Sequence, residues 1–238
     1  MRRAMAICSK ELQSYFYSPT VYVAFAVYVL MSSIMFYLNF VLTNYSIVDV
    51  RLVVGNTSFI YLFIIPLLTM RLVSEEFRQG TDELLLTSPA GIGEIVAGKY
   101  MAALTLMLLL VGSSLIYPWI MSGFGDLEQP VLWLSYLSMF LLGAAMMAIG
   151  LFSSTLSSNQ MVAGIAGFVI LLLLWIVDWM ADGFGGKFRE YIVQFSLTAR
   201  QANLQKGVFH LADVLFYVML IAVFLVLSIQ TLERKRWR

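Results

Sequence analysis

Long apolar stretches without a charged residue dominate this chain, and they predict helices that cross a membrane. Asp, Glu, Lys and Arg are absent from five stretches, residues 12–48, 52–70, 100–125, 129–177 and 214–232. An α-helix rises about 1.5 Å per residue, so roughly 20 apolar residues cross the hydrocarbon core of a bilayer. Each stretch is therefore long enough for at least one span.

The stretch 129–177 is too long for one span and divides into two. Residues 153–160 (SSTLSSNQ), near its middle, concentrate hydroxyl and amide side chains that favour a turn at the membrane interface. Spans are therefore predicted at about 132–151 and 161–177.

The stretch 12–48 is predicted to contain only one span. Residues 12–19 are mixed in polarity, and residues 39–46 (NFVLTNYS) close its far end. The prediction is thus an all-α integral membrane protein, with six transmembrane helices in a single domain over residues 1–238.

Residues 1–19 are expected to form an interfacial helix before the first span. Lys10 and Glu11 fall on other faces of this helix than its apolar residues, which makes it amphipathic. A frayed basic tail is the alternative. The apolar residues recur at helical spacing and are Met5, Cys8, Leu12 and Phe16.

Residues 71–99 form the polar loop between the second and third spans. Residues 74–78 are expected to continue the second span as a short helix that ends at Gly80. Thr81 is then expected to cap a further helical turn containing Glu83, because carboxylates favour the positive start of a helix. A solvated charge cluster without a partner is the alternative. Lys99 is expected to mark the start of the third span.

Residues 178–213, between the fifth and sixth spans, are too long for a simple turn. Their apolar side chains are spaced as on one face of a helix, which predicts a second amphipathic helix that rests on the membrane or folds back into it. A plain surface loop is the alternative. The residues of this apolar face are Phe188, Tyr191, Ile192 and Phe195.

The amino-acid composition agrees with the apolar stretches in indicating a membrane protein. Apolar residues make up 61% of the chain and charged residues 12%, whereas soluble domains contain about 45–50% and about 25%. This composition therefore argues against a water-soluble enzyme. With six spans both termini share a side, and that side holds ten of the 15 Lys and Arg residues. Because basic residues accumulate in cytoplasmic loops, both termini are predicted to lie in the cytoplasm.

The residues needed for common catalytic sites are scarce. His210 is the only histidine and Cys8 the only cysteine, so one chain can build neither a His-based zinc site nor a disulfide. Gly93, Gly98 and Lys99 match a phosphate-binding loop, but Tyr100 stands where Ser or Thr would bind magnesium. Nucleotide binding is therefore rejected, and the chain is expected to hold no cofactor or metal and to bind no nucleic acid.

Two segments carry a resemblance to a known family. Together with the interfacial helix and the six spans, residues 75–89 (EEFRQGTDELLLTSP) and 213–237 (DVLFY…LERKRW) resemble the type-2 ATP-binding-cassette exporter permeases. The resemblance covers essentially the whole chain. It is strongest to the branch related to the gliding-motility permease of the bacterial inner membrane.

The resemblance implies a coupling helix in residues 71–99 that docks onto a separate ATPase subunit. It implies two ATPase copies, which bind ATP and magnesium, and a second permease chain, identical or related. It also implies short re-entrant helices after the fifth span. The residues implied at or near the ATPase contact are Glu75, Glu76, Arg78, Gly80, Thr81 and Glu83, with Lys10, Glu11 and Leu12 of the interfacial helix beside them.

Other functions stay open at this stage. A secondary transporter or channel that works without ATP is the main alternative, and a membrane scaffold or membrane enzyme is a third. The transported substrate is not readable from the sequence. Glu83→Arg is expected to weaken ATPase docking and to leave membrane insertion intact.

Overall fold

The chain is helical throughout the part that the structure describes. In the computed structural model this part comprises residues 2–42, 49–81, 90–183 and 196–236, and no strand occurs in it. Its elements, in chain order, are α1 Arg2–Phe16, α2 Pro19–Phe36, the π-helical turn η1 Tyr37–Val41, α3 Val50–Thr69, α4 Ser74–Gln79, α6 Ile92–Ser114, α7 Ile116–Met121, α8 Gln129–Leu156, α9 Gln160–Gly183, α11 Leu197–Gln205 and α12 Leu211–Arg236.

Six helical segments of the described chain are long and apolar enough to cross a membrane, which confirms the predicted number of spans. Each predicted span falls on one of them, and the turn predicted within 153–160 separates α8 from α9. The six segments are Pro19–Val41, Val54–Gln79, Ile92–Met121, Gln129–Leu156, Gln160–Val177 and Leu211–Arg236.

The helix α6 begins at Ile92, seven residues before Lys99, where the third span was predicted to start. Glu94 helps to start this helix, because its carboxylate accepts the backbone N–H of Gly91 at 3.3 Å. Counting charge-free residues identifies only part of this helix, since Glu94 and Lys99 both lie inside α6. Lys99 therefore belongs to the helix and not to the loop before it.

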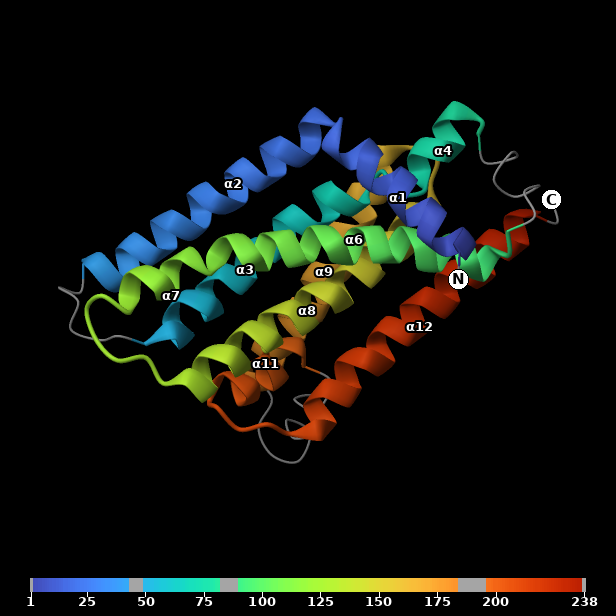
Figure 1. The fold of residues 1–238 in the computed structure, drawn as a ribbon. Helices are drawn as coiled ribbons and strands as arrows, with labels where there is room; N and C mark the ends of the chain where they lie inside the picture. The colour runs from blue at the N-terminus through green and yellow to red at the C-terminus, as the bar shows by residue number, and fades with distance from the viewer. Residues whose placement is uncertain (1, 43–48, 82–89, 184–195, 237–238) are drawn as a thin grey trace.

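The centre of the bundle is formed by α3 and α8. In the most apolar windows of these two helices 72% and 78% of the residues are buried, against 17% in both α9 and α12. Figure 1 shows α2 and α12 along opposite edges of the bundle. Gly150 permits the close approach of the two central helices, because a Cβ there would lie 2.1 Å from Oγ1 of Thr69.

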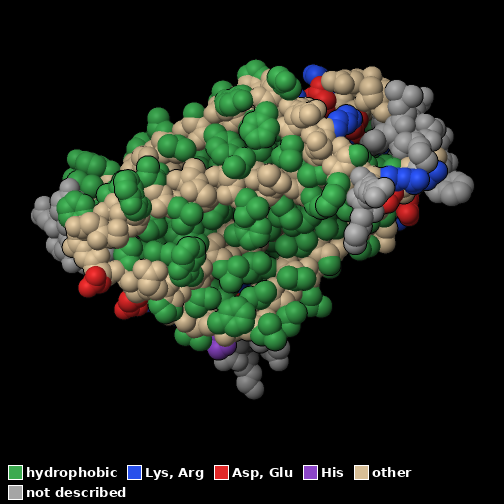
Figure 2. All heavy atoms as spheres, in the orientation of Figure 1, with side chains coloured by type: hydrophobic (Ala, Val, Ile, Leu, Met, Phe, Trp, Pro, Cys, Tyr) green, Lys and Arg blue, Asp and Glu red, His purple; other side chains and the backbone are tan. Residues whose placement is uncertain are grey.

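Hydrophobic side chains cover the visible side of the bundle, while charged side chains gather toward its two ends (Figure 2). Large exposed apolar patches mark contact with a membrane or another protein. The six long helices and this apolar side together fit a multi-pass membrane protein. Examples of exposed apolar side chains are Val23, Trp119, Trp133, Ile165 and Met219.

The start of α1 and the last turns of α12 lie at one end of the bundle, which we call the terminal end (Figure 1). The short helix α11 lies at the opposite end, where Arg200 forms a 2.8 Å ion pair with Asp213 of α12. Tyr217 of α12 donates its hydroxyl to the carbonyl of Leu197 at 2.7 Å. The amphipathic helix predicted around residues 188–195 lies outside the described residues.

Candidate functional site

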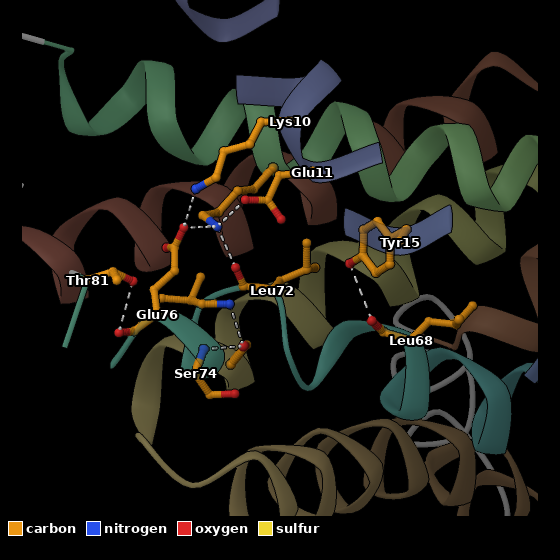
Figure 3. A network of polar contacts seen from close by, with 11 residues as sticks. Lys10, Glu11, Tyr15, Leu68, Leu72, Ser74, Glu76 and Thr81 are labelled. Carbon is orange, nitrogen blue, oxygen red and sulfur yellow. Dashed lines mark hydrogen bonds and ion pairs between the residues drawn. The ribbon is translucent and has the colours of Figure 1, made fainter. Parts of the chain in front are cut away.

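The helix α1 lies across the beginning of α6 at the terminal end. Gly98 makes this contact possible, because a Cβ there would lie 2.7 Å from the carbonyl oxygen of Ala4 and 2.9 Å from Cβ of Ile7. Farther along α1, Tyr15 is buried and donates its hydroxyl to the carbonyl of Leu68 at 3.3 Å (Figure 3). The segment predicted as an interfacial helix or a frayed tail is thus a helix packed on the bundle.

The short helix α4 is stabilised at both ends. At its start, Oγ of Ser154 accepts the N–H groups of Val73 and Ser74 at 3.0 and 3.1 Å. At its end Gly80 is left-handed, with φ +65°, and the N–H of Thr81 bonds back to the carbonyl of Glu76 at 3.0 Å. This left-handed cap confirms the prediction that Gly80 ends the helix.

Lys99 of α6 joins three segments at one point. Its ammonium lies 2.8 Å from Oε1 of Glu11 in α1 and 2.9 Å from Oε1 of Glu76 in α4. It also donates to the carbonyl of Leu72, between α3 and α4, at 2.6 Å. Figure 3 shows the side chains of Lys10, Glu11 and Glu76 close together, with Lys10 paired to Glu76. We call Lys10, Glu11, Glu76 and Lys99 the charged junction.

The charged junction is electrically balanced, and three of its four side chains are largely shielded from water. The side chain of Lys99 is 1% exposed, and those of Glu11 and Glu76 are each 12% exposed. Lys10 adds a second cation, 3.6 Å from Glu76. A buried charge is costly unless it is paired, so the shielded groups of Glu11, Glu76 and Lys99 depend on one another. The junction therefore holds α1, α4 and α6 together.

A cleft of about 500 Å³ opens beside the charged junction. Residues of both α1 and α4 line it, so it follows the seam between the two helices. Oε2 of Glu76 is buried with no hydrogen-bond partner, although Oε1 of the same carboxylate is fully engaged. The lining residues are Lys10, Glu11, Ser14, Tyr15, Arg71, Leu72, Glu75, Glu76, Gln79, Thr81 and Lys99.

The sixth span reaches α4 from another side. Nζ of Lys235, in the last turn of α12, lies 3.8 Å from the ring centre of Phe77. The same ammonium donates to the carbonyl of Thr155 at 2.9 Å. A cation above an aromatic face is attracted to it, so α12 and the end of α8 are both tied to α4.

The residues of the loop 71–99 that were predicted together at the ATPase contact have different environments in the structure. Glu76 is part of the charged junction, whereas Glu75 pairs with Arg78 at 2.7 Å on the surface of α4. Gly80 and Thr81 form the end of α4. Glu83, and the helical turn that Thr81 was expected to cap, lie outside the described residues.

The three residues singled out in α1 have different environments. Lys10 and Glu11 belong to the charged junction. Leu12 is partly buried and packs against the hydrophobic core. The prediction that α1 lies next to α4 agrees with the Lys10–Glu76 ion pair between them.

Sequence reasoning missed the residue at the centre of the site. Lys99 was noted as the boundary of a span and as part of a rejected phosphate-binding motif, and its partners are 88 and 23 positions earlier in the chain. No periodicity links residues so far apart. One signal was available: a lysine at the eighth position of a helix that starts at Ile92 needs a carboxylate partner if the helix is packed on that side.

Burial also determines the protonation of two groups in α1. Burial, with a smaller contribution from Glu11, raises the pKa of the Tyr15 phenol well above its usual value of 10.0, and nearby Arg71 opposes this. Tyr15 is therefore a neutral hydrogen-bond donor at physiological pH. Burial and then Glu11 also raise the pKa of the Cys8 thiol.

The arrangement is suited to mechanical transmission. Among the residues that the structure describes, no three His, Cys, Asp or Glu side chains gather as metal ligands. Residues 93–99 are helical, so they lack the loop conformation of a phosphate-binding motif. What the site does provide is a short capped helix linked by ion pairs to α1 and α6 and by a cation–π contact to α12.

Comparison with known proteins identifies the family. The ABC-2 family transporter protein model matches residues 5–237. No curated protein matches the sequence significantly. The family match spans nearly the whole chain, and the six apolar helices are those a membrane transport component requires. The chain therefore belongs to the ABC-2 transporter family and is a permease component of an ABC transporter.

Proposed function

We propose that this chain is the permease subunit of an ATP-driven exporter, and that a separate ATPase subunit docks on α4 and the residues that follow it. One observation carries the proposal: α4 is connected through Glu76 and Lys99 to a membrane-spanning helix. A helix linked in this way moves the span when it is displaced. The chain itself needs no catalytic group for this role.

The complete transporter is proposed to contain two ATPase subunits and two permease chains, either identical or related. ATP and magnesium bind to the ATPase subunits. The excess of Lys and Arg on the terminal side supports a cytoplasmic location of both termini. A bacterial inner membrane, and a place in the gliding-motility branch of the family, belong to the same proposal and rest on the sequence resemblance.

The mechanism follows from the contacts of α4. ATP binding closes the two ATPase subunits and draws the two α4 helices together. Each α4 pulls on α6 through the Glu76–Lys99 pair and on α12 through Phe77 and Lys235. The halves of the transporter then rock and open the path to the opposite side. α1 follows α6, because Glu11 pairs with the same ammonium.

Docking and transmission are tested by different variants. The permease is co-expressed with its ATPase partner, and the bound ATPase and the transport-linked hydrolysis are measured. Glu83→Arg should reduce co-purification about tenfold or more, because like charges in an interface cost several kcal/mol. Glu76→Gln should leave the ATPase bound but lower the coupled hydrolysis, because it removes the charge that Lys99 pairs with.

The matched control is Glu128→Arg. Glu128 is 76% exposed and pairs with Arg51 at the opposite end of the bundle, so its reversal should change neither measurement. Unchanged co-purification of Glu83→Arg would count against docking at this loop. Transport along an ion gradient by the purified chain without an ATPase would favour the secondary-transporter alternative.

A further inference from the structure

A second cleft, of about 460 Å³, lies where the ends of three spans meet. Ser18 and Thr20 flank the start of α2, Arg71 follows the end of α3, and Gln160 begins α9. α3 contacts both α2 and α9, so the cleft sits over the end of α3 between these neighbours. The lining residues are Ser14, Tyr17, Ser18, Pro19, Thr20, Arg71, Glu75, Arg78 and Gln160.

Arg71 has an unused hydrogen-bonding edge in this cleft. Its Nη1 donates to Oγ of Ser18 and, at 2.7 Å, to Oγ1 of Thr20. Nε and Nη2 have no acceptor in the described chain, and neither atom is buried. These two nitrogens form the planar fork with which a guanidinium binds a pair of anionic oxygens. The two hydroxyls thus hold the guanidinium of Arg71 in place and leave its Nε and Nη2 available to bind a ligand.

The side chains that line the cleft also carry a net positive charge. Glu75 is the one carboxylate among its described lining residues, and it is already paired with Arg78 at 2.7 Å and bonded to Gln79 at 2.6 Å. The charge of Arg71 is therefore not neutralised by the protein. The remaining polar lining consists of hydroxyls and one amide, which can donate further hydrogen bonds to an anion.

The position of the cleft along the spans corresponds to the level of the lipid head groups in a bilayer. The first span begins at Pro19 and α3 ends at Thr69, so Arg71 lies just beyond the hydrocarbon level. Tyr17 is 88% exposed and Tyr22 is 59% exposed beside it. Exposed tyrosines are enriched at the boundary between hydrocarbon and water.

We propose that this cleft binds the phosphate group of an anionic phospholipid, with two phosphate oxygens on Nε and Nη2 of Arg71. A free phosphate ion offers the same oxygens. The lipid is the better occupant because Val23 and Met161, which follow the lining residues Thr20 and Gln160 in α2 and α9, are exposed and provide an apolar surface for acyl chains. The inference does not depend on ATPase docking, and it holds for either orientation in the membrane.

Native mass spectrometry of the purified full-length chain tests the proposal. The protein is equilibrated with equal amounts of phosphatidylglycerol and a galactolipid that has the same acyl chains but no phosphate. The wild type should retain phosphatidylglycerol in preference. Arg71→Gln should lower this retention about tenfold or more, because it removes charged hydrogen bonds. Arg234→Gln, which removes an exposed charge at the same end but outside the cleft, should behave as wild type.

Three results would overturn the proposal. Equal losses of phosphatidylglycerol retention in Arg71→Gln and Arg234→Gln would show that the lipid is attracted to positive charge without a specific site. Equal retention of the galactolipid would show that the phosphate is not recognised. Displacement of the lipid by millimolar inorganic phosphate would identify a free ion as the occupant. If Arg71→Gln does not fold, Arg71→Lys keeps the charge without the fork, and it should still lower retention several-fold.

Discussion

At the scale of single residues, the ammonium of Lys99 is the most constrained group in the molecule's charged junction. An ammonium has three N–H donors, and Lys99 meets three acceptors, on Glu11, Glu76 and Leu72. These acceptors come from α1, from α4 and from the connection before α4. A lysine is suited to this point because its three donors radiate from one atom toward three different segments.

Lys99→Met should lower the free energy of unfolding by about 3–5 kcal/mol, because two shielded carboxylates lose their shared cation. The measurement is unfolding of the purified chain by a denaturing detergent, followed by circular dichroism. The triple variant Lys99→Met, Glu11→Gln, Glu76→Gln should recover much of this loss, since it removes the unpaired charges as well. A triple variant as unstable as the single one would show that packing of the lysine stem, and not charge pairing, dominates.

The thiol of Cys8 provides a pH-dependent prediction. Its raised pKa means that less reactive thiolate is present at neutral pH than for an ordinary cysteine. Alkylation of Cys8 by iodoacetamide in the folded protein should therefore be slow near pH 7 and should accelerate only above the pH at which a free cysteine reacts. A midpoint at or below that of free cysteine would contradict this assignment.

At the scale of elements, the packing of α1 against α6 depends on the absence of a side chain at Gly98. Gly98→Ala would place a Cβ 2.7 Å from a backbone oxygen of α1, which cannot move without displacing the helix. The substitution should destabilise the protein by about 1–3 kcal/mol and raise the reactivity of Cys8 as α1 loosens. Unfolding by denaturing detergent and the alkylation rate are the measurements.

Gly112→Ala is the matched control in the same helix. Nothing lies within 4 Å of a Cβ at that position, so alanine should be neutral or stabilising by up to about 1 kcal/mol through helix propensity. Equal effects of the two substitutions would mean that helix propensity, and not the approach of α1, determines the result.

The ends of the elements were predictable only where local chemistry fixes them. Gly80 ends α4 through its left-handed conformation, and a glycine after a short polar helix is a recognisable signal. The start of α6 was not predicted because Glu94 and Lys99 interrupt the charge-free pattern from which the span was read. Their charges are tolerated inside the helix because α6 extends past the hydrocarbon level to meet α1 and α4.

At the scale of the whole molecule, the number of spans follows from the sequence, but their arrangement does not. α8 and α12 are both continuous apolar helices, yet α8 is central and α12 is mostly exposed. Lipid tails are as apolar as leucine, so the sequence carries little information on which helix faces lipid and which faces protein. For the same reason the charged junction, which joins residues 11, 76 and 99, required the structure.

The central claim is that the end of α4 lies in the cytoplasm and is covered by the ATPase. Labelling of Thr81→Cys, in a Cys8→Ser background, with a membrane-impermeant thiol reagent tests both parts of the claim most directly. We expect no labelling in intact cells, labelling in inverted membrane vesicles, and protection in vesicles when the ATPase is co-expressed. Labelling in intact cells, or equal labelling with and without the ATPase, would contradict the account.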